Sequence, residues 1–118
     1  MKYKIFLSRR FTRERKRLEN TYISLKEEVD KKVKILENNP LDPGLRAQII
    51  SRGGGIRKFR LSTGSFGKRG GFRICYVVKG EWVIVLTIYF KHQRENVLVE
   101  ELKSALRDCL EEIKQTVS

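Results

Sequence analysis

The 118-residue sequence predicts a single α+β domain in which helices cover one antiparallel sheet. Apolar residues recur at helical spacing near both ends of the chain, and strand-length apolar segments lie between them. Glycine or proline separates neighbouring segments, while no internal repeat or linker is evident. We therefore expect residues 1–118 to form one two-layer domain with the element order β-α-α-β-β-β-α.

The chain is expected to begin with a short strand. Lys2–Leu7 has the length of a strand, with apolar residues at every second position from Tyr3. Either Ser8 or Thr12 can then cap a strongly charged helix, because a hydroxyl oxygen accepts a hydrogen bond from a free amide of the first turn.

An N-terminal helical hairpin is expected next. Apolar residues at steps of three and four form one amphipathic stripe: Leu18, Tyr22, Leu25, Val29, Val33 and Leu36. Asn20-Thr21 can break the run, and Ser24 with Glu27 has the pattern of a capping box. The sequence thus predicts two helices, or one bent helix, ending at residues 38–40, where Pro40 disfavours a helical residue before it.

The rest of the chain is expected to supply the sheet and a last helix. After the turn NNPLDPG, Leu45–Ile50 is a short strand candidate and Ile56–Leu61 a clearer one. Phe72–Val78 and Glu81–Phe90 are predicted to pair as a hairpin around Lys79-Gly80. Helical spacing then returns in a C-terminal segment: Val99, Leu102, Leu106, Leu110, Ile113 and Val117.

Charge is the most unusual property of the composition. The chain has 26 Lys and Arg against 14 Asp and Glu, a formal net charge of +12. The positive electrostatic field of such a surplus favours nucleic acid as a partner. A merely soluble basic protein and a membrane-surface binder are the alternatives. The apolar stretch of the basic N-terminus is too short for a signal peptide, and the apolar segment Val83–Phe90 is too short to span a bilayer. We expect a cytoplasmic protein that does not bind membranes.

Most familiar enzyme chemistries lack their residues here. Cys75 and Cys109 lie in core-like surroundings, and one histidine, His92, is too few for a metal site, so no metal or cofactor is expected. In FGKRGG the residue after Lys68 is Arg69 where a phosphate-binding loop needs Ser or Thr. No serine has the surroundings of a catalytic triad, and the acidic residues concentrate in the helical segments.

Cations on the predicted strands carry the functional hypothesis. Lys58, Arg60, Arg73 and Lys91 lie at or near strand positions in a predicted meander, and further cations are close in sequence: Arg57, Lys68, Arg69, His92 and Arg94. Because like charges on neighbouring strands repel, a polyanion is the expected partner. Four aromatic residues are candidates for base stacking, although most are expected in the core: Phe66, Phe72, Tyr76 and Tyr89.

Such a site can bind RNA or also cut it. Ribose carries its own nucleophile, the 2′-OH, so the protein need only orient it, accept its proton and stabilise the anionic phosphorane. Arg and Lys can stabilise that charge, and a lysine or His92 can accept the proton.

The segment GIRKFRL, the later run GKRGGFRICYVVKGEWVIVLTIYFKHQREN and the final EELKSALRDCLEEI together resemble the RelE/ParE superfamily of bacterial toxins, closest to the HigB-like branch. The resemblance covers roughly residues 55 to 115 and, in element order, the whole chain. It implies the two-layer RelE-like microbial RNase fold and a toxin of a type II toxin–antitoxin system. Such toxins are mRNA interferases: ribosome-dependent endoribonucleases that inhibit translation by cutting mRNA in the A site.

The resemblance also implies roles for individual residues. Lys58 and Arg60 look like the strand cations that contact mRNA phosphates, and Arg73 is similar to the arginine that stabilises the transition state. Lys91 matches a cation at the end of the last strand, and the loop Gly64–Gly71 with Lys68 and Arg69 is expected to wall the RNA site. His92 stands where RelE tends to have arginine, and the family's tyrosine near the C-terminus has no counterpart. We therefore expect five catalytic residues, Lys58, Arg60, Arg73, Lys91 and His92, and five residues that bind RNA, Arg57, Lys68, Arg69, Phe72 and Arg94.

The implied partners are mRNA on the ribosome and a cognate antitoxin, which in the HigB branch is usually a helix-turn-helix protein. Two alternatives share the charge but not the chemistry. One is a non-catalytic RNA- or DNA-binding module of the same fold, and the other is a protein whose cationic face mainly docks an acidic antitoxin.

Overall fold

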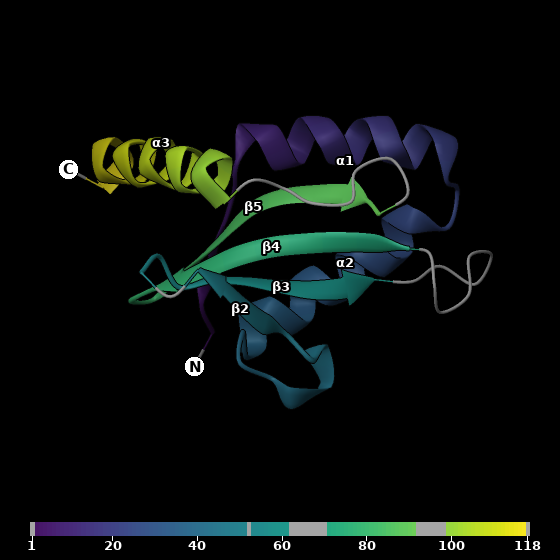
Figure 1. Ribbon diagram of the computed structural model, residues 1–118, viewed down its shortest axis with the longest axis horizontal. Helices are drawn as coiled ribbons and strands as arrows, with labels where there is room; N and C mark the ends of the chain where they lie inside the picture. Colours follow the sequence, from purple (N-terminus) through teal and green to yellow (C-terminus); the bar gives the residue numbers. More distant parts are fainter. Residues whose placement is uncertain (1, 52, 62–70, 92–98, 118) are drawn as a thin grey trace.

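The computed structural model describes residues 2–51, 53–61, 71–91 and 99–117 (Figure 1). In chain order the elements are β1 (Lys4–Leu7), α1 (Arg9–Thr21), α2 (Leu25–Asn38), a 3-10 turn (Pro43–Leu45), β2 (Gln48–Ser51), β3 (Ile56–Leu61), β4 (Phe72–Lys79), β5 (Trp82–Phe90) and α3 (Val99–Val117). The predicted α+β fold is confirmed, and so is the predicted order apart from one additional strand, since both candidates before residue 62 form.

The sheet is mixed, which corrects the expectation of an antiparallel one. Its strand order is β1-β5-β4-β3-β2, and β2 to β5 pair antiparallel with their neighbours. β1 pairs parallel with β5, Lys4 opposite Trp82 and Leu7 opposite Val85. This direction delivers α1 from the end of β1 onto the remaining length of β5, where the two lie side by side (Figure 1).

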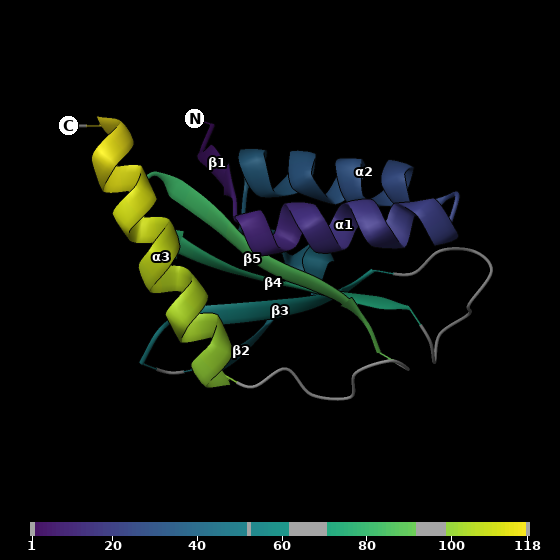
Figure 2. The same cartoon turned by 90° about the horizontal axis from the view of Figure 1, so that it is seen from above.

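Helices cover both faces of the sheet, which corrects the two-layer arrangement. α1 and α2 pack on one face, over a core that includes Phe59, Ile74 and Tyr76. α3 packs on the other, over Cys75 and Val77 among others, and Figure 2 shows it across the sheet from α2. β4 and β5 are apolar on both faces, and each face therefore needs a cover. None of the helices in the described ranges is long and apolar enough to cross a membrane.

Ser8 is the residue that starts α1. Its hydroxyl oxygen accepts a hydrogen bond from the amide of Phe11 at 3.0 Å and donates one to the carbonyl of Leu86 in β5 at 2.9 Å. The capping box expected at the second helix does not form: Ser24 has helical backbone angles and makes no side-chain cap hydrogen bond. A true N-cap needs extended backbone angles, which Ser8 has and Ser24 lacks.

α1 takes the place of a strand beside the second half of β5. β1 reaches only to Val85, and two side chains of the segment that follows satisfy backbone groups beyond it. Ser8 binds the carbonyl of Leu86, while Glu14 Oε1 accepts hydrogen bonds from the Thr87 hydroxyl at 2.6 Å and the Ile88 amide at 3.4 Å. Two backbone groups at this edge of β5, the Leu86 carbonyl and the Ile88 amide, thus have side-chain partners where no strand lies beside them.

A β-bulge in β5 lies at the same place. Cys75 pairs with Thr87 and Tyr76 with Val85, so Leu86 is the extra residue. Before the bulge Val83 and Val85 face the helical hairpin, and after it Ile88 and Phe90 do. One extra residue reverses the alternation of side chains. Tyr89 therefore lies on the face that carries α3.

Ser8 and Ser24 form a matched pair for a stability test. We expect Ser8→Ala to lower the free energy of unfolding by about 1–3 kcal/mol, because the cap is lost and the Leu86 carbonyl loses its partner. Ser24→Ala removes no cap hydrogen bond and should change it by less than about 0.5 kcal/mol. Urea unfolding followed by circular dichroism measures both, and equal losses would contradict the role of Ser8.

Candidate functional site

A cationic pocket lies on the face of the sheet that carries α3, toward the end where β4 begins and β5 finishes. It has a volume of about 390 Å³ and is lined by Arg46, Gln48, Lys58, Phe59, Arg60, Arg73, Tyr89 and Lys91. Five of these eight residues carry positive charge, and none carries negative charge. Four come from the group predicted to be catalytic: Lys58, Arg60, Arg73 and Lys91.

Strand register brings these side chains together. Arg60 lies opposite Arg73, and Arg73 lies opposite Tyr89, so the three form one row across β3, β4 and β5. Lys58, two residues before Arg60, lies in the next row on the same face. Lys91 follows β5 directly, and its amide donates to the carbonyl of Gly71 at 3.1 Å. The strands therefore present three cations on rigid backbone, with a fourth at the rim.

The pocket holds like charges close together. Partial burial and the nearby Arg60 lower the pKa of Arg73, while the electrostatic effect of Tyr89 works in the opposite direction. Arg73 Nη1 donates a hydrogen bond to the carbonyl of Phe72 at 3.2 Å, which holds the guanidinium against its own strand. Directly opposed like charges destabilise a strand pair. An anion bound between Arg60 and Arg73 would remove that repulsion.

Cys75 lies beneath the cations and is not a nucleophile. The side chain is fully buried, and burial raises its pKa to about 12, although Lys58 and Arg10 oppose the shift. Since the thiolate is the reactive form of cysteine, a thiol this hard to ionise is inert at neutral pH. Cys109, also buried, has a pKa raised to about 11.

Two residues predicted to bind RNA lie elsewhere. Arg57 alternates with Lys58 and Arg60, so it projects from the opposite face of β3 and does not line the pocket. Phe72 is fully buried and packs against Tyr22 and Phe90, with both ring-centroid separations at 5.1 Å. The prediction that Phe72 stacks on a base is therefore wrong.

The remaining predicted residues divide into two groups. Lys68, Arg69, His92 and Arg94 lie outside the described residues, as does the aromatic candidate Phe66. Tyr76 is buried, and its hydroxyl donates to the carbonyl of Pro40 at 2.6 Å. Among the described aromatic candidates, Tyr89 lines the pocket, with 8% of its surface exposed.

Sequence reasoning missed Arg46 and Gln48. Arg46 follows the 3-10 turn and has a left-handed backbone, with φ at 53°. This conformation costs most residues about 1–2 kcal/mol and is concentrated at functional sites. The turn sequence LDPG gave a signal for the bend, since Asp42 accepts a hydrogen bond from the Gly44 amide at 2.7 Å. Nothing in the sequence indicated that the bend returns Arg46 to the sheet face.

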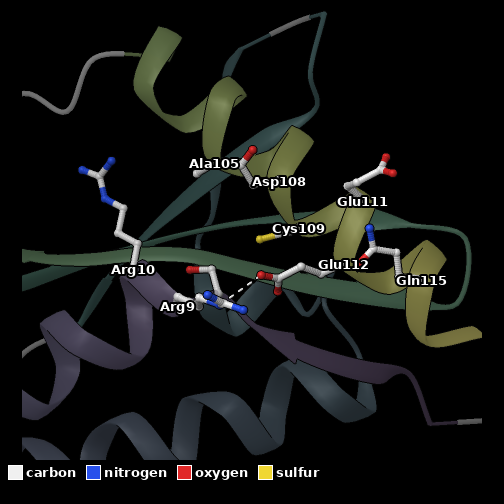
Figure 3. Close-up of a pocket in the computed structure, with 9 residues that line it drawn as sticks. Arg9, Arg10, Ala105, Asp108, Cys109, Glu111, Glu112 and Gln115 are labelled. Atoms are coloured by element: carbon white, nitrogen blue, oxygen red, sulfur yellow. Dashed lines mark ion pairs between the residues drawn. The ribbon is translucent and has the colours of Figure 1, made fainter.

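A second hollow, between the start of α1 and α3, has a different character (Figure 3). Its charges are mixed, because the lining includes Arg9 and Arg10 together with three acidic residues of α3, Asp108, Glu111 and Glu112. Arg9 Nε lies 3.1 Å from Glu112 Oε1, the ion pair drawn in Figure 3. Acidic residues line this hollow beside its cations, whereas the eight residues that line the cationic pocket include no acidic one.

No group of three or more His, Cys, Asp or Glu side chains that could hold a metal ion occurs within residues 2–51, 53–61, 71–91 and 99–117. The pocket itself offers Arg and Lys nitrogens, a phenol and an amide. Protonated Arg and Lys are hydrogen-bond donors with no lone pair for a cation. This donor set suits phosphate oxygens.

Comparison with known proteins shows a shared fold. No protein-family model matches the sequence, and no curated protein matches it. A double arginine-to-alanine mutant of Escherichia coli toxin RelE, solved in the free state, is 19% identical with a TM-score of 0.56, over 96% of this chain and 99% of that chain. A conserved hypothetical protein of Helicobacter pylori, solved in solution, is 18% identical with a TM-score of 0.48, over 76% of this chain and 96% of that one. The chain has the fold of the RelE toxin.

Proposed function

We propose that this protein is a RelE/ParE-superfamily toxin of the HigB-like branch, acting as a ribosome-dependent mRNA endoribonuclease that inhibits translation. The observation that carries the proposal is the row Arg60–Arg73–Tyr89 with Lys58 and Lys91 around it, in one pocket of a RelE-type fold. Cations held together against their own repulsion suit a phosphodiester that gathers negative charge as it reacts.

The proposed reaction uses the substrate's own nucleophile. The ribose 2′-oxygen attacks the adjacent phosphorus while its proton passes to a base, and the bond from phosphorus to the 5′-oxygen breaks. The leaving 5′-oxygen takes up a proton, so the products are a 2′,3′-cyclic phosphate and a free 5′-hydroxyl. Arg60 and Arg73 would bind the phosphorane oxygens, with Lys58 on the neighbouring phosphate. We assign the proton transfer to Lys91, with His92 as a contributor, and no metal is needed.

The partners follow from the same proposal. The substrate is mRNA in the ribosomal A site, where an unpaired strand can enter the pocket and place a base against Tyr89. A cognate antitoxin, of the helix-turn-helix type, would restrain the toxin in the cytoplasm. A non-catalytic nucleic-acid-binding module and an antitoxin-docking protein are the outcomes that the tests below distinguish from it.

Arg73 and Arg57 form a matched pair on opposite faces of the sheet. We expect Arg73→Ala to slow cleavage of mRNA on programmed ribosomes by at least about a hundredfold, because a charge-stabilising donor is lost. Thermal unfolding should occur at the parental temperature or above it, because the repulsion with Arg60 is relieved. Arg57→Ala should cleave like the parent. Equal activity of both variants would show that the pocket is not catalytic.

Lys91 and His92 test the assignment of proton transfer. We expect Lys91→Ala to lose cleavage by about a hundredfold or more and His92→Ala to lose less. Rates are measured on ribosomes between pH 5.5 and 8.5, on either side of the ordinary histidine pKa of about 6.5. If His92 is the base, the cleavage rate of the parent rises as the pH passes through that pKa. In that case His92→Ala loses cleavage and Lys91→Ala keeps it, a result that would reverse the assignment.

Substitutions of Arg46 test whether the RNA-binding site includes the bend before β2. Asn tolerates a left-handed backbone, so Arg46→Asn should keep the unfolding free energy within about 0.5 kcal/mol of the parent. It should weaken RNA binding several-fold at low salt, because one phosphate contact is lost. Arg46→Lys keeps the charge and should keep most of the affinity in a fluorescence-anisotropy titration. Unchanged affinity of Arg46→Asn would place Arg46 outside the RNA site.

A further inference from the structure

The cations of α1 fall into two groups. Arg10 pairs with Glu14 and Glu101, Arg15 with Glu19 and Asp30, and Arg9 with Glu112. The other group is exposed and makes no ion pair or hydrogen bond to any described residue: Arg13, Lys16 and Arg17. We call these three residues the α1 cationic row. Their positive charge is uncompensated by the part of the chain that the structure describes.

The two helices of the hairpin differ sharply in charge. α1 has six basic and two acidic residues, a net +4, whereas α2 has four basic and four acidic residues, a net charge of zero. Arg13 and Arg17 are four residues apart, and Arg13 and Lys16 three apart, spacings at which like charges destabilise a helix. The first turn of α1 also contains no acidic residue to complement the helix dipole. The charge of α1 therefore costs helix stability, which indicates a function outside the fold.

Helix geometry places Arg17, the last residue of the α1 cationic row, on the flank of α1 that faces the pocket end of β5. Glu14 reaches Thr87 and the Ile88 amide, and Arg17 lies one turn further along the same flank of the helix. β5 continues in the same direction to Phe90 and then Lys91, so the C-terminal half of α1 runs toward the pocket end of the sheet. Figure 1 shows α1 lying along β5 over this length.

A third hollow adjoins Arg17 at the end of α1. It has a volume of about 440 Å³ and is lined by Arg17, Leu18, Thr21 and Tyr22. The ring of Tyr22 packs against Phe72 and Phe90, at 5.1 Å and 5.5 Å. The chain neighbours of these two phenylalanines, Arg73 and Tyr89, line the cationic pocket on the opposite face. The hollow at Arg17 and the cationic pocket are therefore separated by the thickness of the sheet at one end.

We propose that the α1 cationic row is a second phosphate-binding surface, and that an RNA strand held in the cationic pocket continues around the end of the sheet onto it. The inference rests on the proposed function only in requiring that the pocket holds RNA. Exposed Arg and Lys bind phosphates without reading sequence, so this surface adds affinity and fixes the direction of the strand.

The chemistry of the row favours RNA over an anionic membrane. A helix that binds a membrane surface needs large apolar side chains beside its cations, which enter the lipid. The uncharged exposed positions within α1 are polar, Thr12, Asn20 and Thr21, and the exposed Ile23 lies after the helix has ended. A hollow lined by Arg17, Thr21 and Tyr22 also suits a nucleotide, because it combines a cation, a hydroxyl group and an aromatic residue.

The experiment compares two triple variants with equal loss of charge. One replaces the row, Arg13→Gln, Lys16→Gln and Arg17→Gln, and the control replaces exposed lysines of α2, Lys26→Gln, Lys31→Gln and Lys34→Gln. Each is titrated with a trinucleotide, which fills the pocket alone, and with an oligonucleotide of about fifteen nucleotides, long enough to reach α1. Both probes carry 2′-O-methyl groups, which block the nucleophile so that neither is cut.

We expect the row variant to bind the trinucleotide like the parent and the long probe at least about tenfold more weakly at low salt. The slope of log affinity against log salt for the long probe should become less steep by about 2, since three contacts each contribute about 0.7. The control should match the parent with both probes. Equal loss for both triple variants would show a general charge effect, and an unchanged row variant would leave the row to an acidic protein partner, so either result overturns the inference.

Failure of this inference is distinguishable from failure of the proposed function. If the parent does not cut mRNA on ribosomes but binds the long probe through the row, the second surface stands and the nuclease does not. If cleavage occurs and depends on Arg73 while the row variant binds both probes like the parent, the nuclease stands and the second surface does not.

Discussion

The edge of β5 beyond β1 is the constraint on which the rest of the structure depends. Without a neighbouring strand, this buried edge would leave the Leu86 carbonyl and the Ile88 amide unsatisfied. Ser8 and Glu14 bind these two groups, so the first two turns of α1 are held against the sheet. The same contacts fix the position of α1 and therefore the strand end that its cations approach. They also lie where the alternation of side chains along β5 changes.

Glu14 also links the edge to the opposite face. It pairs with Arg10 at 3.5 Å, and Arg10 reaches Glu101 in the first turn of α3 at 3.3 Å. A chain of polar contacts therefore runs from Thr87 through α1 to α3. Arg10 and Glu14 are only partly exposed, so these contacts are less screened by solvent than surface ion pairs. The β5 edge of the sheet is thus linked by these contacts to α1 and α3, two helices that lie on different faces of the sheet.

Local pattern predicted much of this fold, and the cations of the pocket as well. Three- and four-residue spacing located the helices, and Lys58, Arg60 and Arg73 lie together as the meander predicted. Period-two alternation also separates Arg57 from Lys58, but the apolar residues of β3 alternate imperfectly, so sequence alone did not assign the faces. Phe72 was misjudged because an aromatic ring next to a cationic loop can equally be core.

Other features depend on contacts far apart in the chain. The parallel pairing of β1 joins residues about 78 positions apart, of which Lys4 and Trp82 are the first pair. Arg46 reaches the pocket because its own backbone is left-handed, and a residue other than glycine gives no sign of that conformation in the sequence. Loop closure over such separations is decided by the whole fold, and short-range propensity carries no information about it.

The bulge at Leu86 determines which side chains of β5 reach the pocket. If Leu86 instead of Thr87 paired with Cys75, the residues after it would move by one position and Tyr89 and Phe90 would exchange faces, with the phenol in the helical-hairpin core and the benzyl ring in the cationic pocket. Deleting Leu86 would close the bulge without this exchange, because Thr87 would still pair with Cys75 and Tyr89 with Arg73. Which ring lines the pocket is therefore decided by strand register at an uncharged residue, and not by any of the cations.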